Sequence, residues 1–164
     1  MPYSALEREG RLRAHGLAAA ECQQHVTELL ELAELDLFDA SIAQRPLDRR
    51  HNSAYEAARA TAEAIMAAEG YRRAGGEGQH AILFVFLNLV DGGRFAGAAR
   101  HFDVARRLRN KTHYEKAGIV SEATATGIIR RARQFLTEAR AWLAQTHPEL
   151  VSAETADDQE NQAY

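Results

Sequence analysis

The chain has 164 residues, the length of one ordinary domain, and it can bury a core without disulfide or metal cross-links. Its 20 basic and 23 acidic residues leave a net charge of -3, which excludes a protein that binds nucleic acid through its overall charge. The single cysteine excludes an internal disulfide, and no signal peptide and no apolar run of about 20 residues occurs. We therefore expect a cytoplasmic protein with no membrane role.

The predicted elements begin with a short, charged, amphipathic helix over residues 4–14. A long helix is expected over about 18–42, because apolar residues recur there at helical spacing. The members of this expected buried stripe are Val26, Leu29, Leu30, Ala33, Leu37 and Ala40. No Lys or Arg occurs over residues 14–44, so the solvent side of this long helix is acidic.

The next long helix is expected to begin at Asn52 or Ser53, which are both favourable N-cap residues. Gly70 is its expected C-terminal stop. Its inner face is predicted to carry Tyr55, Ala58, Ala62, Ile65 and Met66. Glycine and charged residues over 72–78 then indicate a loop.

The segment 79–90 is apolar and rich in β-branched and aromatic residues, which suits a strand as well as a helix. We expect the most buried helix of the bundle there, because the sequence offers no second strand to pair with it. A basic helix is predicted over about 94–116, and Gly118 ends it. Ser121 is the expected N-cap of the last helix, which Pro148 closes.

These elements predict an all-α fold, an antiparallel up-and-down bundle of four to five main helices with a short helix before it. A single domain is expected over residues 1–148. The remaining residues, 149–164, include five acids and no bases, and we expect them to form an acidic, flexible tail.

The basic helix carries the residues with the most chemical potential. Because successive residues of a helix are rotated by 100° about its axis, cationic, amide and ring side chains are expected to lie along two adjoining stripes of this helix. A guanidinium binds phosphate in a bidentate manner, and a histidine takes and releases protons near neutral pH. These groups can cleave RNA without a metal. The catalytic candidates are Arg109, Asn110, His113 and Tyr114, and the phosphate- or RNA-binding candidates are Arg106, Arg107 and Lys111.

The basic stripe also has a simpler interpretation, since such a stripe is commonly a solvated face or the partner of an acidic neighbour. The acidic helix at 18–42 is a candidate for that neighbour, with Asp36 and Asp39 as candidate partners in salt bridges.

Two other patterns suggest metal ligands only weakly. Glu77 and His80 have the Glu-x-x-His spacing of helical di-iron sites, but no second copy exists. Cys22 and His25 offer two of the four ligands that structural zinc needs. We therefore expect no metal and no cofactor, and His80 is expected to be structural.

Over about residues 20–148, the order of elements resembles the HEPN superfamily of small, all-helical prokaryotic domains. The resemblance rests on the leucine-rich, acidic first long helix and on three short segments at 53–59, 68–72 and 78–80. It rests also on the residues 106–110, followed by Tyr114.

Active HEPN domains carry an arginine, often with a polar residue directly after it, and then a histidine that is separated from the arginine by four to six residues of any kind. The resemblance implies a homodimer in which two protomers bring these motifs together for metal-independent RNA cleavage, commonly in toxin and defence systems. Arg109 and Asn110 match the start of the motif, whereas Tyr114 stands where the histidine is expected. His113 keeps a permitted spacing only from Arg106 or Arg107. The resemblance also makes Tyr55 and Glu56 candidate neighbours of this segment.

Two main functions remain open. In the first, the domain binds RNA or nucleotide phosphate. In its catalytic form it is a metal-independent endoribonuclease, with Arg109 holding phosphate, Asn110 orienting it and His113 transferring protons. In the second, the altered motif belongs to a non-catalytic interaction module, such as an antitoxin-like subunit with a cognate protein partner. A helical bundle that binds a small molecule is a third, weaker alternative.

Overall fold

The computed structural model describes residues 2–75, 80–114 and 118–151, with only the backbone of His113 and Tyr114. The predicted all-α class is confirmed, because long helices make up most of the described chain. They are α2 (Ala19–Ala40), α3 (Leu47–Ala68), α4 (His80–Leu87), α5 (Ala96–Tyr114) and α6 (Glu122–Thr146), and the short helix α1 (Ser4–Arg8) precedes them.

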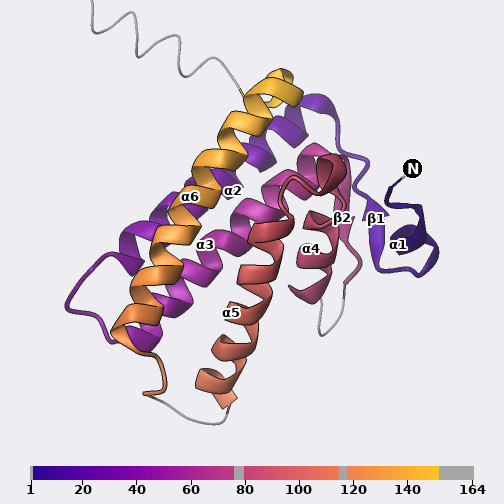
Figure 1. Cartoon of the computed structure of the whole chain (residues 1–164). Coiled ribbons are helices and arrows are strands. Elements are labelled where there is room, and N and C mark those ends of the chain that lie inside the picture. Colours follow the sequence, from indigo (N-terminus) through magenta and orange to yellow (C-terminus); the bar gives the residue numbers. More distant parts are fainter. Residues whose placement is uncertain (1, 76–79, 115–117, 152–164) are drawn as a thin grey trace, which may run out of the picture.

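The helix α3 is the centre of the molecule. It packs against α2 and α6, and it also packs against α4 and α5 (Figure 1). Alanine makes this possible, because its small side chain lets neighbouring helices approach on several sides; the buried alanines of α3 are Ala54, Ala57, Ala58, Ala60, Ala62, Ala64, Ala67 and Ala68. The predicted inner faces of α2 and α3 are both buried.

The start of α3 differs from the prediction. The helix begins at Leu47, and Pro46 is its N-cap, with an extended ψ of 145° and no side-chain cap. The proline carbonyl accepts the first helical hydrogen bond from the N–H of Arg50 at 3.0 Å. Proline fixes its own φ and fits a helix start, so no Asn or Ser cap is needed. Asn52 is consequently inside the helix, where its side chain can bind another element.

A small antiparallel sheet was missed in the sequence. The predicted helix at 4–14 ends at Arg8, and β1 (Leu12–Ala14) pairs with β2 (Tyr71–Arg73), where a loop was expected. Leu12 lies opposite Arg73 in the register and is buried. Strands of three residues are too short to show the alternation by which strands are recognised.

The chain turns sharply between α4 and α5. After α4, which confirms the predicted helix in 79–90, the short 3-10 helix η1 (Val90–Gly93) contains Asp91 with a positive φ of 47°. The Asp91 carboxylate accepts a hydrogen bond from the indole Nε1 of buried Trp142 at 3.2 Å. This turn places α5 alongside α4, so that both cover the same side of α3.

The last helix begins and ends close to the predicted residues. Ser121 is the N-cap of α6, and its Oγ accepts from the backbone N–H of Thr124 at 3.1 Å, as predicted. After α6, the short helix η2 (Pro148–Leu150) packs on α2 with Leu150 buried. Within the described ranges, no helix is both long and apolar enough to cross a bilayer.

Candidate functional site

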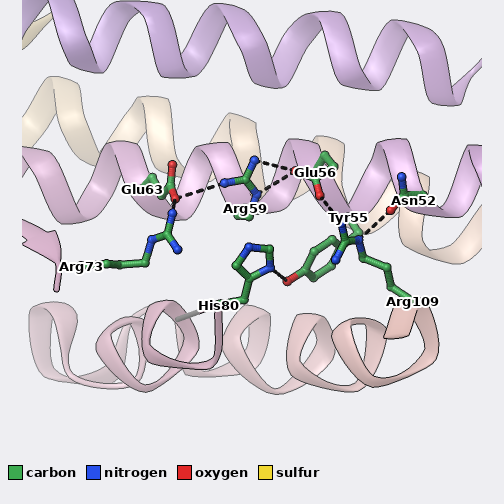
Figure 2. Close-up of polar contacts among 8 residues, drawn as sticks. All are labelled: Asn52, Tyr55, Glu56, Arg59, Glu63, Arg73, His80 and Arg109. Atoms are coloured by element: carbon green, nitrogen blue, oxygen red, sulfur yellow. Dashed lines mark hydrogen bonds and ion pairs between the residues drawn. The ribbon is translucent and has the colours of Figure 1, made fainter. Parts of the chain in front are cut away.

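One face of α3 carries a row of polar side chains toward α4 and α5 (Figure 2). Asn52, Glu56, Arg59 and Glu63 are spaced by three or four residues, so they form a single stripe on the helix. Three other elements add a side chain each. We call the whole set the α3 network; it consists of Asn52, Tyr55, Glu56, Arg59, Glu63, Arg73, His80 and Arg109.

Charges alternate along this network. Arg73 of β2 pairs with Glu63, and Glu63 also pairs with Arg59 at 3.3 Å. Arg59 pairs in turn with Glu56 at 2.7 Å, and Glu56 uses its other oxygen for Arg109 at 3.1 Å. Three arginines and two glutamates leave one formal positive charge. The five side chains are 19% to 26% exposed, so they are shielded from bulk water and yet accessible at their edges.

Arg109 is held from three directions. Its Nε donates to Oδ1 of Asn52 at 2.7 Å, and its Nη2 contacts Oε1 of Glu56 at 3.1 Å. The guanidinium carbon also lies 5.2 Å from the centre of the Tyr55 ring, within the range of a cation–π interaction. Among the described residues, no hydrogen bond or ion pair engages Nη1. These contacts fix the guanidinium in position, and Nη1 is without a partner among the described residues.

Tyr55 connects Arg109 to a histidine. Its Oη is hydrogen-bonded to Nδ1 of His80 at 3.1 Å, and its ring is buried. Burial raises the pKa of Tyr55 to about 12, so the phenol stays protonated at neutral pH. Burial, and then the charges of the nearby arginines, lower the pKa of His80. His80 is therefore neutral at pH 7 and can accept a proton.

The predicted site residues of α5 separate into two groups. Arg106 and Arg107 both pair with Asp103, at 3.0 and 3.2 Å, and neither joins the ion pairs of the α3 network. Arg107 and Lys111 are exposed, and Asn110 is partly buried. Of the predicted α5 residues whose side chains are described, Arg109 alone is in the network.

Two further predicted residues are on the last turn of α5. The side chains of His113 and Tyr114 lie outside the described residues. The hydroxyl of Thr112, just before them, donates to the carbonyl of Arg109 at 2.8 Å.

The acidic helix is not the partner of the basic one in the described part of the chain. On α2, Asp39 pairs with Arg45 at 3.6 Å, and Glu34 pairs with Arg140 of α6. Among the described residues, no ion pair joins Asp36 or Asp39 to α5, so neither expected salt bridge is found there. Arg109 instead contacts Tyr55 and Glu56 of α3, the two residues that the family resemblance made its candidate neighbours.

Most network residues were missed in the sequence. Asn52 was taken as a cap, and Arg59, Glu63 and Arg73 had no assigned role. One signal was present: polar residues recur every three or four positions through a helix that is otherwise mainly alanine. Such a stripe on a central helix indicates that another polar surface faces it.

Two cavities adjoin the ends of the network. One, of about 400 Å³, is next to Asn52 and is lined by Arg45, Asp48, Arg49, Asn52, Ser53 and Thr112. The other, of about 280 Å³, is next to Glu63 and Arg73, with Tyr71 and His25 among its walls. Ligands can thus approach the network at both ends.

The weak metal patterns gain no support from the geometry. No group of three or more His, Cys, Asp or Glu side chains is placed to hold a metal ion within the part of the chain described. Glu77 lies outside the described residues. The buried thiol of Cys22 donates to the carbonyl of Ala67 at 3.5 Å.

A scan against models of protein families, a search of curated proteins and a search of solved structures each found no match. The function is therefore inferred from the geometry of the α3 network.

Proposed function

We propose that this protein is a HEPN-like domain that binds the phosphate groups of RNA or nucleotides at the α3 network, with Arg109 as the principal ligand. The observation that carries the proposal is the fixed guanidinium of Arg109, which is held by Asn52, Glu56 and the Tyr55 ring and has no partner for Nη1 among the described residues. A guanidinium fixed before binding loses less conformational freedom when phosphate arrives.

The charge of the network supports an anionic ligand. Three arginines share two glutamates, so the network carries excess positive charge at a half-shielded surface where screening by salt is weak. A phosphate at Nη1 would form a charge-assisted hydrogen bond and would compete with Glu56 for Arg109. Phosphate affinity is then set by this competition.

The resemblance to HEPN domains extends the proposal to a homodimer and to catalysis. A second copy would bring a second Arg109 to a shared cleft. In metal-independent cleavage, Arg109 would stabilise negative charge on the phosphoryl oxygens, and a histidine would take the proton of the attacking 2′-hydroxyl. His80, neutral beside Tyr55, and His113, on the last turn of α5, are the two candidates for that transfer.

Binding of a labelled mixed-sequence RNA, followed by fluorescence anisotropy with chelator present, tests the proposal. Arg109→Gln is expected to weaken binding by about tenfold or more, because a charge-assisted hydrogen bond contributes about 1.5–3 kcal/mol. Arg107→Gln is the matched control, since it removes the same charge from an exposed position on the same helix. The Arg107→Gln variant is expected to lose less than about threefold in RNA affinity. Equal binding by the two variants would overturn the proposal.

Cleavage is measured on the same proteins by gel analysis of the RNA. The catalytic form of the proposal predicts that His80→Ala or His113→Ala abolishes cleavage and leaves RNA binding in place. Arg109→Lys distinguishes charge from geometry, because lysine keeps the charge but lacks the planar fork of the guanidinium. We expect it to restore only part of the binding that Arg109→Gln loses.

A second candidate function is a protein-interaction module with a cognate partner. The exposed side of α2 favours it, because Leu35 and Phe38 are 64% and 68% exposed beside several acidic residues. Large apolar side chains that share a helix face are common where proteins meet. Analytical ultracentrifugation compares the wild type with Leu35→Ser/Phe38→Ser. This candidate predicts that the wild type self-associates or binds a partner protein and that the variant does neither.

A further inference from the structure

The cavity beside Asn52 differs from an ordinary ligand pocket, because the described residues that line it are all polar or charged. Most small-molecule pockets are lined mainly by apolar and aromatic side chains. We propose that this cavity binds the sugar–phosphate unit of the ribonucleotide next to the phosphate that Arg109 holds. This inference rests on the proposed function and specifies its ligand.

The cavity and Arg109 share their walls. The Asn52 side chain lines the cavity, and its Oδ1 accepts the hydrogen bond from Arg109 Nε at 2.7 Å. Thr112 also lines the cavity, and its hydroxyl donates to the Arg109 carbonyl at 2.8 Å. Asn52 therefore connects the cavity to the Arg109 guanidinium, and Thr112 connects it to the Arg109 backbone, so in this proposal the next unit of a strand held at Arg109 would enter the cavity.

The neutral polar residues suit a ribose. Asn52, Ser53 and Thr112 together present an amide and two hydroxyls, which can donate to and accept from sugar hydroxyls. Among the described residues that line the cavity none is aromatic, so these residues offer no platform on which a base could stack. The base would point away from the walls, and binding would depend little on its identity.

The charged residues suit a second phosphate. Among the described residues, no hydrogen bond or ion pair engages the exposed side chain of Arg49. The side chain of Arg45, which lies four residues before Arg49 and outside α3, forms one ion pair among the described residues, with Asp39 at 3.6 Å. Asp48 is the one acid among the described lining residues, and its Oδ2 accepts a hydrogen bond from the N–H of Gly118 at 2.8 Å. Arg49 thus remains available to an anion.

The size of the cavity agrees with one nucleotide unit. Its volume of about 400 Å³ is near the lower end of the range for small-ligand pockets, which begins at about 300 Å³. On α3, Arg49 precedes Asn52 and Ser53 by about one helical turn, roughly 5 Å along the axis. In this proposal one phosphate is at Arg49, which lines the cavity, and the other is at Arg109, whose partner Asn52 lines the cavity.

The experiment compares oligo(U) with oligo(dU) of the same length, so that only the 2′-hydroxyl differs. The wild type is expected to bind the RNA several-fold more tightly. Ser53→Ala/Thr112→Val removes both hydroxyls with little change in volume, and we expect it to abolish this preference while DNA affinity is retained. Thr137→Val is the matched control, because Thr137 also donates to a carbonyl of its own helix, on α6 and outside the cavity. It should keep the preference.

Uridine 3′,5′-bisphosphate and uridine 5′-monophosphate distinguish a free nucleotide from a strand. Arg49→Gln is expected to reduce affinity for the bisphosphate and for oligo(U), and to leave the monophosphate unaffected. Tight binding of the bisphosphate by the wild type indicates a nucleotide ligand, whereas tight binding of oligo(U) alone indicates an RNA strand. Either result supports a sugar–phosphate site.

Failure of this inference differs from failure of the proposed function. If Arg109→Gln loses binding but the cavity variants keep the wild-type affinity and RNA preference, the cavity inference is wrong and phosphate binding at Arg109 stands. The same conclusion follows if the wild type binds oligo(U) and oligo(dU) equally. If Arg109→Gln binds as the wild type does, the proposed function itself is wrong. Circular dichroism of each variant shows whether it is folded.

Discussion

At the residue scale, the Glu56 carboxylate has two opposing effects. It holds Arg59 and Arg109 at 2.7 and 3.1 Å, and it also neutralises the guanidinium that we propose for phosphate. Glu56→Gln should therefore lower the free energy of unfolding by about 1–3 kcal/mol, because two half-buried guanidinium groups lose their charged partner. The same change should tighten phosphate binding. Urea denaturation and anisotropy measure the two effects.

Glu63→Gln is the control for this prediction. Glu63 pairs with Arg59 and Arg73 and makes no contact with Arg109 among the described residues. Its loss should destabilise the fold to a similar extent without tightening RNA binding. An affinity that rises equally in both variants would show that overall charge, and not the release of Arg109, controls binding.

His51 makes the stability of the fold depend on pH. The side chain is 1% exposed, and Nδ1 has no hydrogen-bond partner among the described residues. Burial lowers its pKa from 6.5 to about 4; Asp48 opposes this shift, and His101 adds to it. Between these two values the unfolded chain binds a proton that the folded chain does not. Stability is therefore fully present above pH 6.5 and decreases as the pH falls toward 4.

The expected loss from His51 is about 2–3 kcal/mol between about pH 7.5 and pH 4.5. His51→Leu should remove this part of the pH dependence, as measured by urea denaturation at both pH values. His25→Leu, at an exposed position of α2, is the control and should lose stability on acidification as much as the wild type. An unchanged pH dependence in His51→Leu would contradict the prediction.

At the scale of the elements, the long helices were predictable and the short elements were not. The buried stripe of α2 repeats over 22 residues, so its period is evident in the sequence. The strands β1 and β2 have three residues each, and they form because their chain segments meet in space. The start of α3 was misplaced because Pro46 supplies the helix start by its fixed φ, whereas good capping residues occur further along at Asn52 and Ser53.

The turn between α4 and α5 depends on Asp91, which combines a φ of 47° with a hydrogen bond to Trp142 at 3.2 Å. Asp91→Asn should be nearly neutral, within about 0.5 kcal/mol, because asparagine tolerates this conformation and keeps the acceptor. Asp91→Ala should cost about 1–3 kcal/mol through strain and an unpaired indole N–H. Asp91→Gly separates the two causes, since glycine tolerates the positive φ but, like alanine, leaves the indole N–H of Trp142 unpaired. Thermal unfolding of the three variants tests the assignment.

At the scale of the whole molecule, the site was less predictable than the fold, because its members come from α3, β2, α4 and α5. Arg109 was identified from its basic surroundings on α5. Its partners were not identified, since no local sequence pattern indicates that Arg109 lies next to Asn52 and Glu56. The basic stripe seen in the sequence is in fact two sets of arginines, of which Arg106 and Arg107 pair with Asp103.

The salt dependence of RNA binding distinguishes a small phosphate site from a broad basic surface. Contacts to about two phosphates, at Arg109 and Arg49, predict a slope of about −1.4 for log affinity against log salt concentration. Arg49→Gln should make this slope shallower by about 0.7. Anisotropy titrations between about 50 and 200 mM salt measure it. A slope several times steeper would mean that RNA lies along the exposed cations of α5 instead.

The pairing of β1 with β2 has a consequence for folding kinetics and local opening. It joins residue 12 to residue 73, a contact distant in sequence that must form after a costly loop closure. A two-stranded ribbon of three residues per strand is expected to open at a lower free energy than the helical core. Amide protons of β1 and β2 should then exchange with solvent earlier than those of α3. Because Arg73 belongs to β2, each opening would withdraw one arginine from Glu63 and alter the charge balance of the α3 network.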